Sequence, residues 1–255
     1  MDTSVGRRSH LGFTSTSVRH TPSLVFPDRS HATLSDGNGL HTHISIHSPK
    51  ASEGEISSLA PSLNPLEAIF LQSLLDNLGG ICAFSMTAPS SYERINERVR
   101  ESGQHVWGPG KHVCWGSHHR QVPIRLCGPP GAHKFELRSV DASANPHLLL
   151  ASIVAVAIEG VDNQISLTAS DSTALLDQSA TVAVIPDELP HSFDEAFRCL
   201  EEQDTMGKFF GEDFIRAYRR VIQVRSPARR ARHCDLHPRK TGGPPISWSC
   251  RPNST

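Results

Sequence analysis

The sequence lacks several features that mark whole classes of protein. Its six cysteines form no CxxC pair and its first 22 residues are polar, so we expect neither a disulfide framework nor a secretory leader. The longest largely apolar run, 148–158, has 11 residues, which is well short of the roughly 20 that a membrane-spanning helix needs. We therefore expect a cytoplasmic protein with no membrane partner.

The chain also lacks an excess of either charge. Its 25 Lys and Arg residues balance 26 Asp and Glu residues, and the net charge of -1 creates no overall field for nucleic acid. With 255 residues, it can bury a core without disulfide or metal support. The unusual count is that of histidine, at 15, which points to metal or phosphate chemistry or to unusual terminal segments.

Both ends of the chain lack hydrophobic periodicity. Residues 1–30 are rich in Ser, Thr, Arg and His, and residues 225–255 are rich in Pro, Arg, Gly and Ser, so we expect both segments to be poorly ordered. The stretch 225–240 carries six basic residues and one acidic residue, a composition also found in nucleic-acid patches. We favour an unstructured end, no nucleic-acid partner, and a folded part over residues 31–224.

The segment 41–47 predicts a half-buried strand. His41, His43, Ser45 and His47 alternate with Thr42, Ile44 and Ile46. Because successive side chains of a strand point to opposite faces, the histidines share one face and the isoleucines the other.

Helix signals follow the strand. Asn64-Pro65 opens a helix that Gly79-Gly80 is expected to end, and Asn145-Pro146 opens another that runs to about Gly160. Further helices are predicted over 91–100, 192–203 and 211–224. Two strands, 122–126 and 134–140, flank the turn Gly-Pro-Pro-Gly, and the Gly-rich stretch 103–116 reads as a binding loop. Strands followed by several helices indicate an α+β fold.

Four stretches carry a resemblance to a known family: GNGLHTHISI (37–46), SYER (91–94), WGSHHRQVPIR (115–125) and KFELRSVDASANPHLLLASIVAVAIEG (134–160). Their order and spacing resemble the catalytic domain of glutamine synthetase over roughly residues 31–224. The resemblance implies an antiparallel sheet packed with helices. It also implies an incomplete domain, because nothing before Asp36 resembles the family's N-terminal β-grasp domain.

The resemblance implies a role for each of nine residues. His41 and Glu136 resemble ligands of the Mg or Mn that bridges the ATP phosphates, and imidazole with carboxylate suits such a metal. His43 and Lys134 resemble ATP-contacting residues. Arg120 and Arg125 resemble the catalytic arginines that hold the phosphoryl group and ATP, since a guanidinium offsets developing charge. The glutamate-binding residues are Gly37, Arg94 and Arg138.

In the family, ATP phosphorylates glutamate and ammonia or an amine attacks the acyl phosphate, in homo-oligomeric rings. The sequence departs from the family pattern at three positions. Lys134 replaces an arginine, His119 replaces an asparagine, and Lys111 stands where we align the family's flap glutamate. The carboxylates for the family's other metal are also not found. Two interpretations follow: a ligase of this type, or an inactive fragment or pseudoenzyme that binds nucleotide or family subunits.

Overall fold

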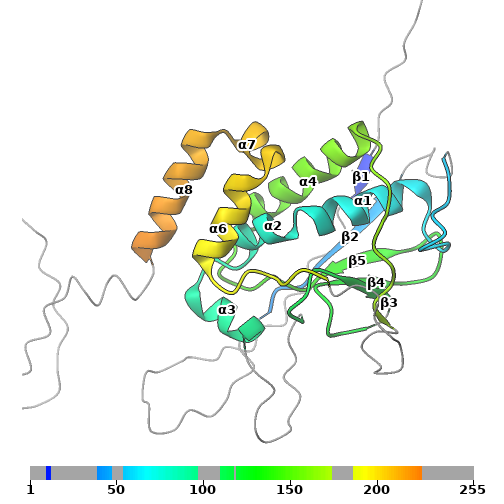
Figure 1. Cartoon of the computed structure of the whole chain (residues 1–255), viewed down its shortest axis with the longest axis horizontal. Helices are drawn as coiled ribbons and strands as arrows, with labels where there is room; N and C mark the ends of the chain where they lie inside the picture. Colours follow the sequence, from blue (N-terminus) through cyan, green and yellow to red (C-terminus); the bar gives the residue numbers. More distant parts are fainter. Residues whose placement is uncertain are drawn as a thin grey trace, which may run out of the picture.

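The computed structural model describes residues 10–12, 39–47, 54–96, 110–117, 119–173 and 186–225. The strands are β1 (His10–Gly12), β2 (Thr42–His47), β3 (Trp115–Ser117), β4 (Ile124–Cys127) and β5 (Lys134–Leu137). The helices are α1 (Pro65–Asp76), α2 (Leu78–Ser85), α3 (Pro89–Asn96), α4 (Pro146–Asp162), α6 (Phe193–Glu202), α7 (Asp204–Phe210) and α8 (Glu212–Arg225). Figure 1 shows the strands toward one end of the molecule and α6 to α8 toward the other.

The strands form one sheet in the order β1-β2-β5-β4-β3. The first three pairings are antiparallel, whereas β3 pairs parallel to β4. The α+β class is confirmed, but the sheet is mixed rather than wholly antiparallel. Two strands were not predicted: β3 lies at the end of the expected Gly-rich loop, and β1 lies within the N-terminal segment.

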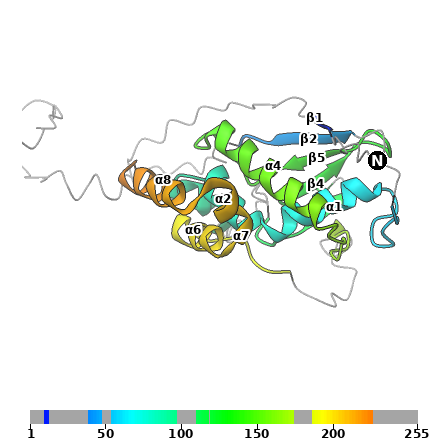
Figure 2. The ribbon, with the colours of Figure 1, turned by 90° about the horizontal axis from the view of Figure 1, so that it is seen from above.

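One face of the sheet belongs to the hydrophobic core. Ile44, Phe135 and Leu126 occupy matched positions on β2, β5 and β4, and all three are buried. The ring of Phe70 on α1 meets Phe135 edge-on, with ring centroids 5.2 Å apart. Figure 2 shows α1 and α4 on the same side of the sheet. Because side chains alternate along each strand, this packing leaves the other face for polar residues.

Two helix starts agree with their sequence signals. The Asn64 side chain accepts a hydrogen bond from the Glu67 N–H, and the Glu67 carboxylate accepts one from the Asn64 N–H, so a complete capping box opens α1. Asn145 caps α4, which extends to Asp162. Each cap satisfies backbone donors that have no partner within the helix.

The prediction that Gly79-Gly80 ends a helix is wrong. The first helix ends at Asp76, and both glycines lie inside α2, which is bent by 72° relative to α1. A Cβ on Gly79 would lie 3.1 Å from the Cys199 sulfur, and one on Gly80 would lie 3.2 Å from the Cα of Leu200. The glycines therefore serve the close approach of α2 to α6 and do not terminate the helix.

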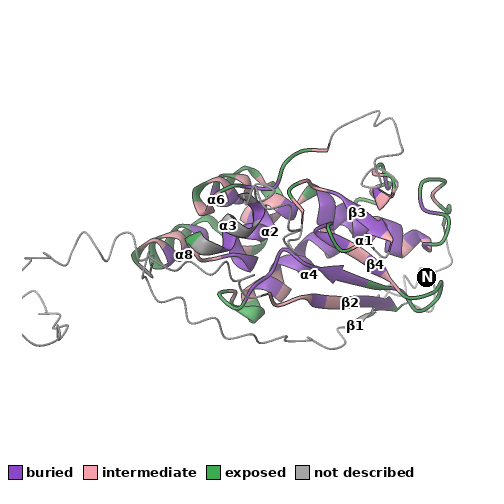
Figure 3. Ribbon diagram, turned by 90° about the horizontal axis from the view of Figure 1, so that it is seen from below, coloured by how far each residue is buried: buried purple, intermediate pink, exposed green. Residues whose placement is uncertain are grey.

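The remaining helices pack around α2 and α4. The structure adds α7, which was not predicted, between the expected helices α6 and α8. Figure 3 shows buried positions concentrated in the sheet and in α1, α2 and α4. Among the described residues, no single helix is long and apolar enough to cross a membrane; α1 and α2 reach that length and composition only as a bent pair.

Candidate functional site

A row of matched residues crosses four strands on the polar face of the sheet. His43 on β2 pairs in register with Glu136 on β5, and Glu136 pairs with Arg125 on β4. Arg125 in turn pairs with Gly116 on the parallel edge strand β3. Strand pairing thus brings together residues from three of the four stretches that carried the family resemblance.

Glu136 is the centre of this row. Its Oε1 lies 2.8 Å from His41 Nδ1 and accepts a hydrogen bond of 2.7 Å from Arg138, while its Oε2 accepts one of 2.9 Å from Arg125. The Glu136 side chain is only 4% exposed. A buried carboxylate is stable when its charge is paired and hydrogen-bonded, and two guanidinium groups provide that here.

The titration of the row reflects this arrangement. Burial by itself raises the pKa of Glu136, but the hydrogen bond from His41 and the charges of Arg138 and Arg125 outweigh it and lower the pKa from its usual 4.5 to about 2. Burial is also the main cause that lowers the pKa of His43. At neutral pH the row therefore contains an ionised carboxylate beside a neutral His43 imidazole.

The two arginines that hold Glu136 keep further donors available. The Nε atoms of Arg125 and Arg138 are buried, and neither has a hydrogen-bond partner among the residues that the structure describes. Burial lowers the pKa of Arg138, the charge of Glu136 raises it, and the charges of Arg125 and Arg120 lower it further. Arg120 is exposed and close enough to Arg138 to contribute to its electrostatics.

Three other predicted site residues have different outcomes. Lys134 is exposed on β5, where it pairs in register with Cys127, and its charge acts on His43. Arg94 belongs to α3, but its side chain is outside the described residues, as is the whole of Gly37. The structure therefore groups His41, His43, Arg125, Glu136 and Arg138, with Lys134 and Arg120 at the edges.

The positions that depart from the family pattern are also visible. Lys111 forms an exposed ion pair of 3.0 Å with Glu188, close to the start of α6. His119 accepts a hydrogen bond from the Gln121 N–H through Nδ1. Neither side chain is tied to Glu136 by a contact in the structure.

Two residues near the row were not predicted. Cys127 lies two residues after Arg125 on β4, on the same face of the strand, and its thiol is 3.7 Å from Glu136 Oε2. Extending the predicted strand 122–126 by one residue, with the same alternation of faces, identifies Cys127. Asp171 accepts hydrogen bonds from the Ser117 and Thr173 N–H groups and lies beside Gly116. Asp171 has no sequence signal, because it comes from an irregular segment.

The predicted metal ligands fit a divalent cation poorly. Mg²⁺ requires near-octahedral coordination, mostly by oxygen. The described residues contain no group of three candidate ligands, and both oxygens of Glu136 are already held by guanidinium hydrogen bonds. His41 and Glu136 are adjacent, as ligands of one metal would be, yet they do not form a metal site by themselves.

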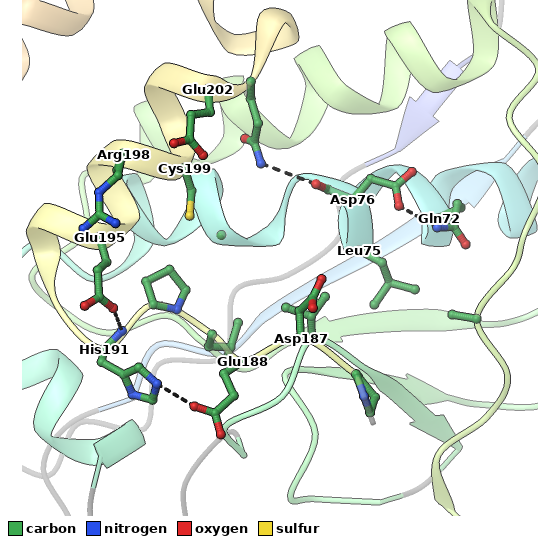
Figure 4. Close-up of a pocket in the computed structure, with 17 residues that line it drawn as sticks. Gln72, Leu75, Asp76, Asp187, Glu188, His191, Glu195, Arg198, Cys199 and Glu202 are labelled. Atoms are coloured by element: carbon green, nitrogen blue, oxygen red, sulfur yellow. Dashed lines mark hydrogen bonds and ion pairs between the residues drawn. The ribbon is translucent and has the colours of Figure 1, made fainter. Parts of the chain in front are cut away.

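A cavity of about 680 Å³ lies elsewhere, between α1, α6 and the segment 186–190. Figure 4 shows Asp76, Glu188, Glu195 and Glu202 around it, together with His191 and Arg198. None of the predicted site residues whose side chains the structure describes lines this cavity. The candidate site is therefore the polar face of the sheet.

Comparison with known families agrees with this fold. The family model described as glutamine synthetase, catalytic domain, matches residues 30–230. The chain therefore belongs to the glutamine synthetase catalytic-domain family, and the resemblance carried by its motifs is confirmed.

Individual relatives are distant. Protein fluG of Emericella nidulans is 27% identical over 208 residues, which are 80% of this chain and 21% of that protein. Glutamate–methylamine ligase of Methyloversatilis universalis is 29% identical over 71% of this chain and 41% of that enzyme. A solved GmaS/ADP complex superposes with a TM-score of 0.58 at 25% identity, over 76% of this chain and 44% of that one. The chain spans less than half the length of each of these relatives.

Proposed function

We propose that this chain carries part of the active site of an ATP-dependent ligase, which joins ammonia or an amine to the side-chain carboxylate of glutamate through an acyl phosphate. The observation that carries this proposal is the row of His43, Glu136 and Arg125 within a glutamine synthetase catalytic domain. The amine is left open, because one relative is a methylamine ligase.

In this proposal each cation has a defined task. Arg138 grips the glutamate carboxylate together with Arg94, since a guanidinium fork matches a carboxylate bidentately. Arg120 and Arg125 hold the phosphoryl group in transfer and offset the charge that develops on it. His43 and Lys134 contact ATP. Glu136, which also pairs with His41, fixes the orientation of Arg125 and Arg138 by accepting a hydrogen bond from each.

The reaction class includes a divalent cation, Mg or Mn, whose chemistry is to neutralise the ATP phosphates. The described residues supply only His41 and Glu136 toward it, and the contacts of Glu136 argue against that role. We assign no step of the reaction to a metal held by these two residues.

The test is an assay of the purified chain for phosphate release from ATP and for hydroxamate formation with hydroxylamine. We expect both to depend on glutamate, and we expect Arg138→Lys to raise the KM for glutamate, because lysine cannot bind a carboxylate bidentately. Arg198 lines the separate cavity, so Arg198→Gln serves as the matched control. It should change neither the glutamate-dependent phosphate release nor the KM for glutamate. Absence of glutamate-dependent phosphate release would count against ligase activity.

A second candidate function is nucleotide or subunit binding without turnover, in a fragment or pseudoenzyme. The specific observation in its favour is that the described residues contain no group of three metal ligands. ATP binding by a chain that releases no phosphate would support this candidate. The homo-oligomeric rings and cytoplasmic location of the sequence analysis stay predictions.

A further inference from the structure

Helix α8 carries two apolar rows, and only one of them faces the core. Ile215, Tyr218 and Ile222 form the buried row, and the Tyr218 hydroxyl donates a hydrogen bond to the Ala83 carbonyl oxygen of α2. The exposed row, the α8 stripe, consists of Phe214, Ala217, Val221 and Val224.

The spacing of the α8 stripe is that of a helix–helix interface. Its members lie three, four and three residues apart, which matches the a and d positions of a coiled coil. Val221 and Val224 are 55% and 68% exposed, and Phe214 is 39% exposed although its ring stacks against Tyr218. A row of apolar side chains on the surface marks an interaction site, because packing another helix against it removes apolar area from water.

The charged residues beside the stripe favour a second copy of α8 as that other helix. Asp213 and Arg220 are both exposed and lie seven residues apart, so they occupy the same flank of the stripe. In an antiparallel pair with Phe214 of one protomer over Ala217 of its partner, a large side chain meets a small one. In the same alignment Asp213 of each protomer faces Arg220 of the other. The helix is therefore complementary to itself in both shape and charge.

The ion pairs within α8 are compatible with this arrangement. Asp213 pairs with Arg216 at 3.0 Å, and Arg216 also lies 3.8 Å from Glu212. All three side chains are more than half exposed, and surface pairs of this kind contribute little to stability. Asp213 can therefore turn to Arg220 of a partner while Arg216 keeps Glu212.

We propose that this protein forms a two-fold symmetric dimer in which α8 of one protomer packs antiparallel against α8 of its partner through the α8 stripe. Both protomers contribute the same residues, so the interface is closed, whereas a ring needs two different surfaces. Because α8 lies at the end of the molecule away from the sheet (Figure 1), the dimer leaves the polar face of the sheet uncovered. The inference goes beyond the proposed function and does not depend on it.

The experiment is sedimentation equilibrium of the full chain over a range of protein concentrations. We expect a weak monomer–dimer equilibrium, because two helices of 14 residues bury a small area. Val221→Glu places an unpaired charge in the stripe and should weaken dimerisation by about tenfold or more. Ile56→Glu is the matched control, since Ile56 is 60% exposed and precedes α1; it should dimerise like the wild type.

A charge exchange tests the direction of the two helices. Asp213→Arg and Arg220→Asp should each weaken the dimer by about tenfold, because each change places like charges opposite each other at both ends of the interface. The double variant should regain most of the wild-type affinity. Both side chains are exposed, so all three variants should keep the circular dichroism spectrum of the wild type.

Several outcomes would overturn the inference. One is a chain that stays monomeric at every concentration, and another is an assembly that persists in Val221→Glu, because it would use a different surface. Loss of the dimer in both single charge variants without recovery in the double variant would exclude the antiparallel pairing. Dimerisation that appears only after removal of residues 226–255 would show that the chain's own end covers the stripe. None of these results bears on glutamate-dependent phosphate release, which tests the ligase proposal separately.

Discussion

Glu136→Gln gives the most direct test of the charge arrangement in the site. The variant keeps the size of the side chain but removes the charge that Arg125 and Arg138 share. Folding lowers the pKa of Glu136 from 4.5 to about 2, and each pH unit corresponds to about 1.4 kcal/mol, so ionised Glu136 contributes about 3 kcal/mol to stability. This agrees with the cost of about 3–5 kcal/mol for removing one partner of a buried ion pair.

The sign of the pH dependence follows from the lowered pKa. Because the folded state binds the Glu136 proton more weakly than the unfolded state, the contribution is complete above pH 4.5 and is lost as the pH falls toward 2. The stability difference between wild type and Glu136→Gln should therefore be about 3 kcal/mol at pH 7 and less than about half of that at pH 3.

Urea unfolding at several pH values, followed by circular dichroism, measures this difference. Glu201→Gln is the matched control, since Glu201 pairs with Arg219 on the surface and such pairs contribute less than about 1 kcal/mol. A difference that stays constant between pH 7 and pH 3 would refute the assignment of Glu136 as a buried, ionised counter-ion.

The remaining predictions concern the scaffold and are checked by urea unfolding. Gly80→Ala should destabilise by about 1–3 kcal/mol, because its Cβ would collide with α6, whereas Gly207→Ala, with open space around it, should be neutral or stabilise by up to about 1 kcal/mol; equal effects would contradict this packing. Asn145→Ala should cost about 1 kcal/mol through loss of the α4 cap, and no loss would mean that the cap is dispensable. Phe70→Ala should cost about 3–5 kcal/mol by opening a cavity against Phe135; a loss below about 1 kcal/mol would exclude tight packing there.

Short-range signals in the sequence predicted much of the fold. The alternation over 41–47 corresponds to β2, with Ile44 and Ile46 buried. The Asn-Pro pairs predicted the starts of α1 and α4, because a cap is a contact between residues two or three positions apart. These predictions succeed because each depends on residues that are close together in the sequence.

Other features had no local signal. The strand β3 is three residues long and is stabilised by its parallel pairing with β4, which the residues of either segment do not encode alone. The pair Gly79-Gly80 has the composition of a helix end, yet it lies within α2 because α6 packs closely against it. Here a tertiary contact overrides local propensity.

The candidate site shows the same division. Sequence motifs identified His41, His43, Arg125, Glu136 and Arg138, and their residue types already determined that the site is rich in cations. Only the strand register brought His43, Glu136 and Arg125 into one row, and only the packed structure showed that two guanidinium groups hold both Glu136 oxygens. Whether a carboxylate meets a metal or an arginine depends on neighbours that are distant in sequence, so tertiary structure decides its chemistry.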